Sequence, residues 1–578
     1  MKRAHKIAGL AIVVAAALAL LIIQALWRPF EFHHEPEKPQ VYDVHIDINR
    51  PDAVIDSSAL SRLPRDIVKV PLLQTLLTED FVDYYETHPT RLSAEGALRR
   101  FAFEHDLDWR DGIIRQIFDE PARVLLWRSP DHRLGRWMIS MRRNGVAKLV
   151  QAIGNVAASD SQLSRIAKLP DGTPVYAIRL ATNHTLIYAA KDDRLVIMSE
   201  PGMLLDNANE PIRERVKAVT RMLDDGTDDA LRSYGLEHVP LAANGHRLAV
   251  SVNYLSFGYQ AFFMGIDALR FDFAPAANGG ESTWSTSALV VPEHLPQGWN
   301  SADLWHALPA NPAACASLPV DWNDATQLLD RLGDAGKEAA PILSKALAGP
   351  AAVCWYAKSS LVAPVFVAQL SPGAQRDPKQ QAAIRHALGE VLFPQIIGAY
   401  EAKADSDEDY SRLPVQTAVD DAAGVASWMR PVSALAGTAA SSTAPFAKQL
   451  SAPRYFPVTL ALTPRYAIFS PDARLVQDTL AVLDKRYPAL ADTIAPARLA
   501  STMVVIAPSA AAAMAEREVM LALPADQEPI FRNAARTYLF PKLRAVAQYP
   551  TISLSRRNAP LPSKAGWVDV DWHTESGK

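Results

Sequence analysis

The amino-acid sequence has few cysteines and no excess of positive charge. Its 578 residues include only two cysteines, which excludes a disulfide framework and any cysteine-rich zinc or iron–sulfur module. Hydrophobic residues make up 49% of the chain, as in an ordinary folded protein. Lysine and arginine number 59 against 63 aspartates and glutamates, so the basic excess typical of nucleic-acid-binding proteins is missing. We therefore expect no nucleic-acid partner.

Only one stretch is apolar enough to cross a membrane. It extends from Ile7 to Trp27, interrupted by Gly9 and Gln24, and about 20 helical residues match the ~30 Å hydrocarbon core of a bilayer. Three basic residues precede this stretch, so the positive-inside rule predicts a cytoplasmic N-terminus. The alternative is a cleaved signal peptide, but its apolar core is usually about 7–15 residues long. We expect an uncleaved, single-pass anchor in the bacterial inner membrane, with the bulk of the chain in the periplasm.

The sequence predicts four regions. Residues 1–28 form the cytoplasmic tip and the anchor, and residues 29–55 form a polar, proline-containing connector. Two α+β domains are expected to follow, over residues 56–298 and 299–578.

An order of strand-like segments recurs in the two halves. A helical stretch opens at Leu63 in the first half and at Leu308 in the second. Apolar segments then follow in matching order: 122–127 and 351–356, 137–141 and 364–370, 194–199 and 465–470, and 247–252 and 499–505. This recurrence predicts an internal duplication.

Short connections and alternating side chains indicate antiparallel strands. Residues 129–132 and 191–193 are too few for a parallel crossover, and the apolar spacing over 382–391 is typical of a helix that covers a sheet. The expected fold class is therefore α+β: two similar domains of antiparallel sheet covered by helices, after one N-terminal transmembrane helix.

Two groups of residues have the composition of metal ligands without the required pattern. Asp405, Asp407 and Asp409 alternate as in a calcium loop, but Tyr410 stands where the loop requires glycine. The run His33–Glu35 lies in the connector and lacks further ligands. We predict neither a metal site nor a cofactor.

Sequence motifs of catalysis are also missing. The patterns Gly-x-Ser-x-Gly, Ser-x-x-Lys and His-Glu-x-x-His do not occur. His184 near Asp192, and His246 near Ser251, are pairings that chance produces among 14 histidines. Gly279-Gly280 is expected to form a turn between strands rather than a phosphate loop. The sequence identifies no catalytic residue.

The two cysteines allow two interpretations. In an oxidising compartment, a disulfide between Cys315 and Cys354 would close a loop of about 40 residues and stabilise the fold. Alternatively, Cys354 lies in an apolar strand, where a free thiol behaves as a small core residue.

Four aromatic residues lie close together at Phe257, Tyr259, Phe262 and Phe263. On a helix this spacing is typical of a core-facing side, whereas exposed side chains would form a contact surface for a partner or lipid.

The region after the connector resembles a known family. The residues that carry the resemblance are Leu63-Pro64-Arg65-Asp66-Ile67, Val70-Pro71-Leu72-Leu73 and 77–85. The family consists of membrane-anchored bacterial proteins with a domain of unknown function that covers nearly the whole chain. Its members tend to be encoded near an alpha-2-macroglobulin-like protein, which implies a role in the Gram-negative envelope and such a protein as partner. The resemblance supplies no catalytic residue.

The expected function is that of a non-enzymatic binding or scaffold protein, held at the inner membrane by its N-terminal helix. One alternative is a periplasmic hydrolase acting on peptide, glycan or lipid, with a site assembled from distant residues. Another is a peptide- or lipid-binding module with an apolar groove.

Overall fold

The structure is a computed structural model, and it places most of the chain after residue 43. The residues that it describes are 44–60, 63, 121–130, 134–142, 163–181, 184–208, 210–226, 229–255, 265–274, 283–294, 299–327, 329, 333–401, 413–420, 424–434, 437–441, 443–452, 454–522, 532–557 and 561–575. The predicted membrane segment 7–27 lies outside them. The described residues form two compact units, one with residues 44–255 and 267–289, the other with residues 265–266 and those from 290 onward.

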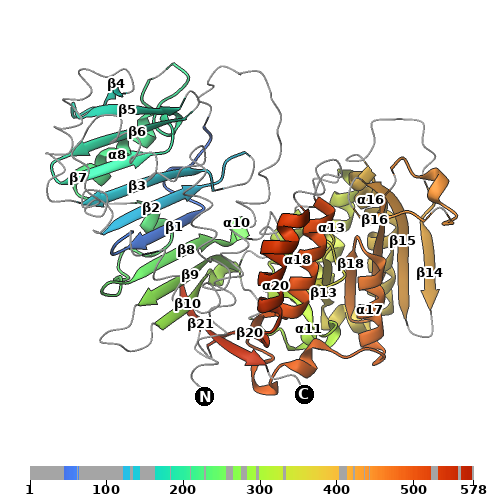
Figure 1. Ribbon diagram of the computed structural model, residues 1–578. Helices are drawn as coiled ribbons and strands as arrows, with labels where there is room; N and C mark the ends of the chain where they lie inside the picture. Colours follow the sequence, from blue (N-terminus) through green and yellow to red (C-terminus); the bar gives the residue numbers. More distant parts are fainter. Residues whose placement is uncertain are drawn as a thin grey trace. The chain divides into compact units, whose positions relative to one another are not determined.

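The described part of the first unit contains ten strands (Figure 1). They are β1 (Ala53–Ser57), β2 (Ala122–Trp127), β3 (Arg136–Arg142), β4 (Leu163–Lys168), β5 (Pro174–Ala181), β6 (His184–Lys191), β7 (Arg194–Met198), β8 (His246–Ser251), β9 (Ile266–Ala274) and β10 (Thr283–Val290). Antiparallel pairing places them in the order β4-β5-β6-β7-β3-β2-β1-β8-β9-β10. The described helices are η2 (Pro201–Met203), α8 (Arg213–Asp224), α9 (Asp229–Ser233) and α10 (Val252–Leu255).

The second unit contains eleven described strands. They are β11 (Pro312–Leu318), β12 (Leu347–Tyr356), β13 (Val365–Leu370), β14 (Gln416–Asp420), β15 (Val425–Ala434), β16 (Thr438–Ala439), β17 (Arg454–Leu462), β18 (Tyr466–Ser470), β19 (Thr502–Ile506), β20 (Thr551–Arg556) and β21 (Gly566–Glu575). Their pairing gives the order β14-β15-β17-β18-β13-β12-β11-β19-β20-β21, and the short β16 also pairs with β17.

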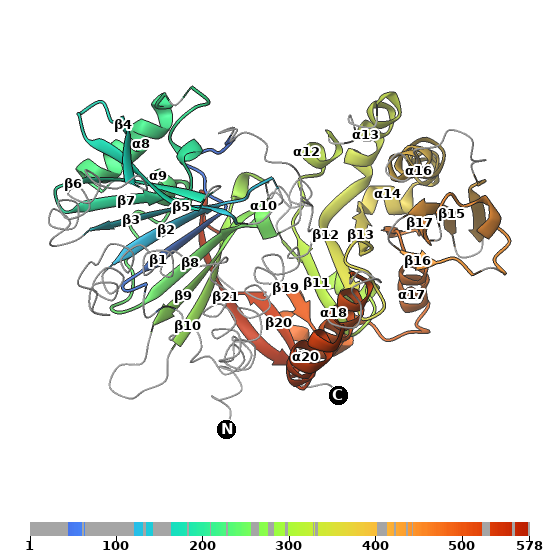
Figure 2. The same ribbon diagram turned by 45° about the horizontal axis from the view of Figure 1, so that its top comes forward.

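Helices occupy the connections between these strands. They are η4 (Pro292–His294), α11 (Ala302–Ala307), α12 (Trp322–Gln327), α13 (Asp334–Ala346), α14 (Pro372–Arg376), α15 (Pro378–Arg385), the π-helix η6 (His386–Leu392), α16 (Phe393–Glu401), η7 (Ala447–Gln449), α17 (Ala473–Leu483), η8 (Leu490–Thr493), η9 (Pro496–Arg498), α18 (Pro508–Ala522), the π-helix η10 (Ala535–Leu539) and α20 (Phe540–Ala547). The helix expected over 382–391 therefore exists, although it changes from α to π at His386. Helices α18 and α20 lie side by side in both views (Figures 1 and 2).

The order of pairing in the second unit repeats that of the first, strand for strand along the chain. Omitting β16, strands β1–β10 correspond to β11, β12, β13, β14, β15, β17, β18, β19, β20 and β21. The opening of the repeat differs from the prediction. Leu308 precedes β11, whereas Leu63 follows β1, and neither β1 nor β11 was predicted as a strand. In addition, β1 begins inside the segment expected to be a connector.

The structure corrects the expected fold class. We predicted two domains of antiparallel sheet covered by helices, after one transmembrane helix, but the described strands belong to one antiparallel sheet of 21 strands with a few helices. No helix within the described residues is long and apolar enough to span a membrane. Alternation and short turns specify which strands form hairpins. The extent of a sheet depends instead on the backbone N–H and C=O groups of its edge strands. Nearly every residue has these groups, so the side-chain pattern does not show where a sheet ends.

One core of the second unit lies between α17 and the sheet. Leu475 and Val476 of α17 pack in a cluster that includes Tyr466 and Ile468 of β18, and all four side chains are buried. Helix α17 contacts both β17 and β18. The helix thereby has a fixed position against the β17–β18 turn.

The two cysteines form a disulfide, which settles the alternatives left by the sequence. Cys315 of β11 and Cys354 of β12 lie directly opposite each other in the ladder, and both are buried. In the first unit the corresponding strands β1 and β2 pair Val54 with Leu125, both fully buried. The disulfide therefore occupies the place of an ordinary apolar pair.

This correspondence suggests a variant that removes the cross-link while keeping the packing. The double substitution Cys315→Val and Cys354→Leu should lower the free energy of unfolding by about 2–4 kcal/mol, since the unfolded chain would lose its loop constraint. Denaturant unfolding with and without reductant measures the effect. The double alanine variant should lose more, because it also leaves a cavity. Equal stability of the wild type and the Val/Leu variant under oxidising conditions would contradict a stabilising cross-link.

Candidate functional site

An open depression of about 660 Å³ lies in the second unit, at the corner where α17 ends. Three segments supply its walls: the end of α11, the β17–β18 turn, and the end of α17 with the chain that follows it. The lining residues are His306, Arg465, Val482, Leu483, Lys485, Arg486, Tyr487, Pro488, Ala489 and Asp492. Four of them are basic or imidazole side chains, all exposed, and one is a carboxylate.

The capping of α17 determines where these side chains lie. At the start of the helix, the Asp472 side chain accepts a hydrogen bond from the Arg474 backbone N–H at 3.0 Å. At its end, the Lys485 N–H donates to the Val482 carbonyl at 2.9 Å and the Arg486 N–H donates to the Ala481 carbonyl at 2.7 Å. This is the Schellman arrangement, which turns the chain sharply after the last helical residue. It places Lys485, Arg486 and the residues after them along the edge of the depression.

The positive side chains of the depression are only partly neutralised. The guanidinium of Arg486 pairs with Asp484 at 2.7 Å. Arg465 lies over the ring of Tyr466 with its guanidinium carbon 5.3 Å from the ring centroid. Within the described part of the chain, neither Arg465 nor Lys485 nor His306 has a carboxylate partner. The corner therefore presents positive charge to solvent.

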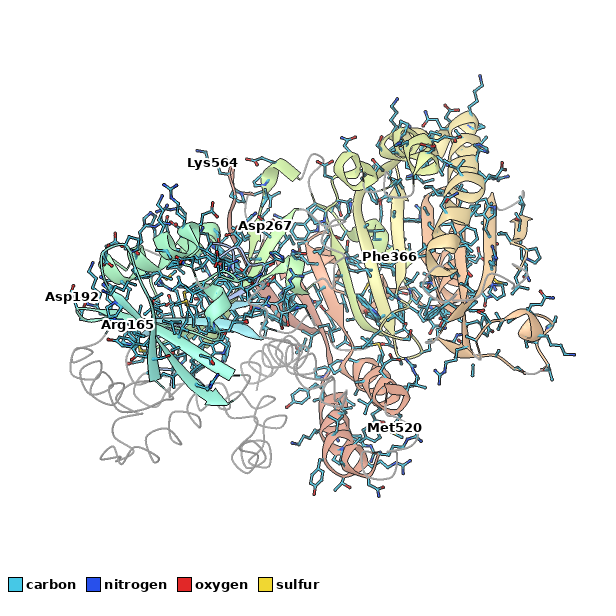
Figure 3. All side chains as sticks on the ribbon, turned by 90° about the horizontal axis from the view of Figure 1, so that it is seen from above. Arg165, Asp192, Asp267, Phe366, Met520 and Lys564 are labelled. Carbon is cyan, nitrogen blue, oxygen red and sulfur yellow. A yellow bond between two sulfur atoms is a disulfide. The ribbon has the colours of Figure 1, made fainter. Side chains whose placement is uncertain are left out.

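The matching corner of the first unit arranges its charges differently. There the Lys191 ammonium binds Asp171 at 2.8 Å and also binds Asp224, the last residue of α8. The hydrogen bond from Lys191 lowers the pKa of Asp171 to about 2. Arg142 is paired with Asp193 in the same hairpin region, where Asp192 lies at the tip (Figure 3). The cations of this corner are thus paired within the protein.

The residue after the helix also differs between the two corners. Helix α8 ends with Asp225 as C-cap and Gly226 at φ +77°, while α17 ends with Asp484 as C-cap and Lys485 at φ +59°. A Cβ atom at Gly226 would come within 1.8 Å of Arg194, so the first unit fills this space with a guanidinium. In the second unit, Lys485 adopts the left-handed backbone conformation that favours glycine.

Lys485 is unusual among residues with this backbone conformation. The other described non-glycine residues with positive φ are Asp192, Asn244 and Asn311, which are types that tolerate it. A lysine there costs about 1 kcal/mol relative to glycine. Because conformational strain often lies at functional sites, Lys485 is a candidate for a role in binding. A simpler explanation is that the ammonium stabilises the negative end of the α17 dipole.

The structure separates the histidine pairs suggested by the sequence. His246 and Ser251 are at opposite ends of β8, and His246 Nδ1 instead lies 2.7 Å from the Ser57 hydroxyl on β1. This Ser–His pair is buried, with 1% and 2% of the two residues exposed, so no substrate reaches it. His184 begins β6 and Asp192 follows its end, roughly 25 Å away along an extended strand. Neither pair supports a hydrolase site.

The other predicted candidates lie outside the described residues. They are Asp405, Asp407 and Asp409, Tyr410, the run 33–35, the turn at Gly279-Gly280, and the aromatic residues Phe257, Tyr259, Phe262 and Phe263. Where the structure does describe the chain, no group of three His, Cys, Asp or Glu side chains is placed to hold a metal ion.

Sequence reasoning missed the basic depression. Its residues come from positions 306, 465 and 482–492, which share no motif. A signal was nevertheless present: after matched strand pairs, one half reads Asp225-Gly226 and the other Asp484-Lys485. This difference, a lysine in the position where the other half has glycine after a helix, could have identified the corner as a candidate site.

Lys485→Gly is expected to stabilise the protein. The substitution removes the backbone strain and copies the solution found at Gly226, with a gain of about 0.5–1 kcal/mol after the lost dipole interaction is counted. Thermal or denaturant unfolding measures it. Lys485→Arg, which keeps both the charge and the strained backbone, should leave stability unchanged. A marked loss of stability in Lys485→Gly would show that the lysine serves the helix end rather than a ligand.

Comparison with known proteins supplies the family. Residues 6–572 match the model of a family described as "Uncharacterized protein conserved in bacteria (DUF2138)". A relative from Escherichia coli strain K12, named "Uncharacterized protein YfaA", is 31% identical over 539 residues, which cover 92% of this chain and 91% of the relative.

Solved structures give only a distant likeness. Crystal forms IV and III of TP0453 match 43% of this chain and 82% and 80% of theirs, with 7% and 8% identity. Their TM-scores of 0.23 and 0.22 are too low to support any conclusion about this protein.

The family match and the relative from E. coli both extend over nearly the whole length of this chain. The chain therefore belongs to the DUF2138 family of uncharacterized bacterial proteins.

Proposed function

We propose that this chain is a non-enzymatic binding protein of the bacterial envelope, and that it holds an anionic ligand in the basic depression beside α17. The observation that carries the proposal is the contrast between the two corners. The first unit neutralises Lys191 internally through Asp171 and Asp224. The second exposes the cations Arg465 and Lys485, beside the imidazole of His306, without carboxylate partners among the described residues. Unpaired, clustered cations are the feature that attracts an anion.

The chemistry of the lining favours binding over hydrolysis. Among the described residues, the lining of the depression includes no serine, threonine or cysteine that could serve as a nucleophile. They do include arginine and lysine, the side chains that bind phosphate and carboxylate oxygens through charge-assisted hydrogen bonds. A ligand bound through such hydrogen bonds is held without any covalent reaction, as expected of a binding protein.

We further propose that the protein is attached to the inner membrane with its bulk in the periplasm. The apolar run 7–27 and the basic residues before it support this orientation. The disulfide Cys315–Cys354 supports an oxidising compartment, because disulfides persist there and are rare in the cytosol. An alpha-2-macroglobulin-like envelope protein is the partner that the family resemblance suggests, and the recurring strand order supports an origin by duplication.

Binding of a simple anion tests the proposed function. The full chain in detergent, titrated with inorganic pyrophosphate at low salt by calorimetry, is expected to bind it. Arg465→Gln or Lys485→Gln should weaken binding by about 5–10-fold, since each removes one charge-assisted contact. Lys337→Gln is the matched control, because this exposed lysine lies on α13 outside the depression. Equal affinity in all four proteins, or no binding at all, would contradict the proposal.

Protease accessibility tests the proposed topology. Protease added to spheroplasts should degrade the chain beyond the anchor, since that part is expected outside the inner membrane. A tagged cytoplasmic protein is the control for intact cells. Protection of the bulk of the chain until detergent is added would overturn this topology.

A further inference from the structure

The depression is larger than a simple anion requires. Its volume of about 660 Å³ lies within the range of clefts that hold organic ligands, roughly 300–1,000 Å³. The cations occupy only part of the lining, and Val482, Leu483 and Pro488 supply an apolar part. The ligand of such a site has an anionic group together with a larger body.

A carboxylate lies among the cations. One oxygen of Asp492, Oδ2, accepts a hydrogen bond from the Ala489 backbone N–H at 3.1 Å. Among the described residues, no donor binds the other oxygen. An ionised carboxylate only accepts hydrogen bonds, and it repels a bare anion. Its presence in a basic site therefore favours a ligand that brings hydroxyl donors as well as negative charge.

An aromatic ring is also available. Tyr487 lines the depression, and it is one of the large side chains that the structure leaves exposed, at 42%. An exposed aromatic face with a polar tip suits a ring that is apolar on its faces and polar at its edges. A saturated sugar ring has this character, since its C–H groups lie on the faces and its hydroxyls at the rim.

The cations, the carboxylate and the aromatic ring of the depression together fit one class of ligand. We infer that the basic depression binds a phosphorylated sugar, with the phosphate held by Arg465 and Lys485, a hydroxyl donating to Asp492, and the ring lying against Tyr487. The inference rests on the proposed function and adds the chemical nature of the ligand.

Three probes separate the contributions: inorganic phosphate, glucose 6-phosphate and glucose, each titrated calorimetrically into the full chain in detergent at low salt. Glucose 6-phosphate is expected to bind roughly 3–10-fold more tightly than inorganic phosphate, because it adds the hydroxyl and ring contacts. Glucose alone should bind far more weakly than either.

Two variants test the assigned roles. Asp492→Asn keeps an acceptor for the Ala489 N–H but removes the negative charge, so it should tighten phosphate binding by about 2–3-fold and weaken glucose 6-phosphate binding. Tyr487→Ala should reduce the affinity for glucose 6-phosphate to that for phosphate, while Tyr487→Phe, the matched control, should retain it. A purely structural role for either residue would change both affinities together.

The outcomes distinguish the two proposals. If phosphate binds and glucose 6-phosphate binds no more tightly, with the variants showing no difference between the two ligands, the sugar assignment is wrong and the anion site remains. If glucose binds as tightly as its phosphate, the sugar-phosphate assignment is also wrong. If no phosphate compound binds, the proposed function fails together with the inference.

Discussion

Antiparallel backbone pairing determines where the residues that line the depression lie. The ladder between β17 and β18 sets the turn that carries Arg465, and α17 packs against these two strands through Leu475 and Val476. The end of the helix is therefore held close to the turn. The depression exists because two rigid elements end at the same corner, which is how scaffolds usually position binding residues on connecting segments.

The two units place different side chains on the same backbone plan. At one corner Lys191 is shared by two carboxylates, and Gly226 gives the helix an unstrained end. At the other, the chain tolerates a lysine at φ +59° and leaves cations exposed. The strained backbone at Lys485 and the exposed cations are each mildly unfavourable for folding. The exposed positive charge attracts anions from solvent. The difference between two similar corners is better evidence for function than either corner alone.

The sequence predicted the local structure better than the sheet. Segments such as 122–127, 194–199 and 465–470 correspond to β2, β7 and β18, because alternation and short polar turns are encoded locally. The strands β1 and β11 were not predicted, because β1 has only five residues and β11 is rich in alanine, so neither shows a clear alternation. The extent of the sheet was not predicted either, since edge pairing depends on backbone groups that carry no sequence signal. The depression was not predicted either, because Arg465 and Lys485 come to line the same depression only through the packing of α17. Membrane attachment and partners stay predictions from the sequence.

The buried disulfide has a consequence for how the protein matures. Val54 and Leu125 complete the first unit's ladder as soon as its strands associate, without any chemical reaction. The second unit joins Cys315 to Cys354 at the same point of its ladder, and this joining removes two electrons from the pair. Formation of the cross-link therefore depends on an oxidant in the surroundings, whereas the corresponding pair of the first unit requires only packing. In a newly made chain, the second unit thus gains its cross-link only where an oxidant is available.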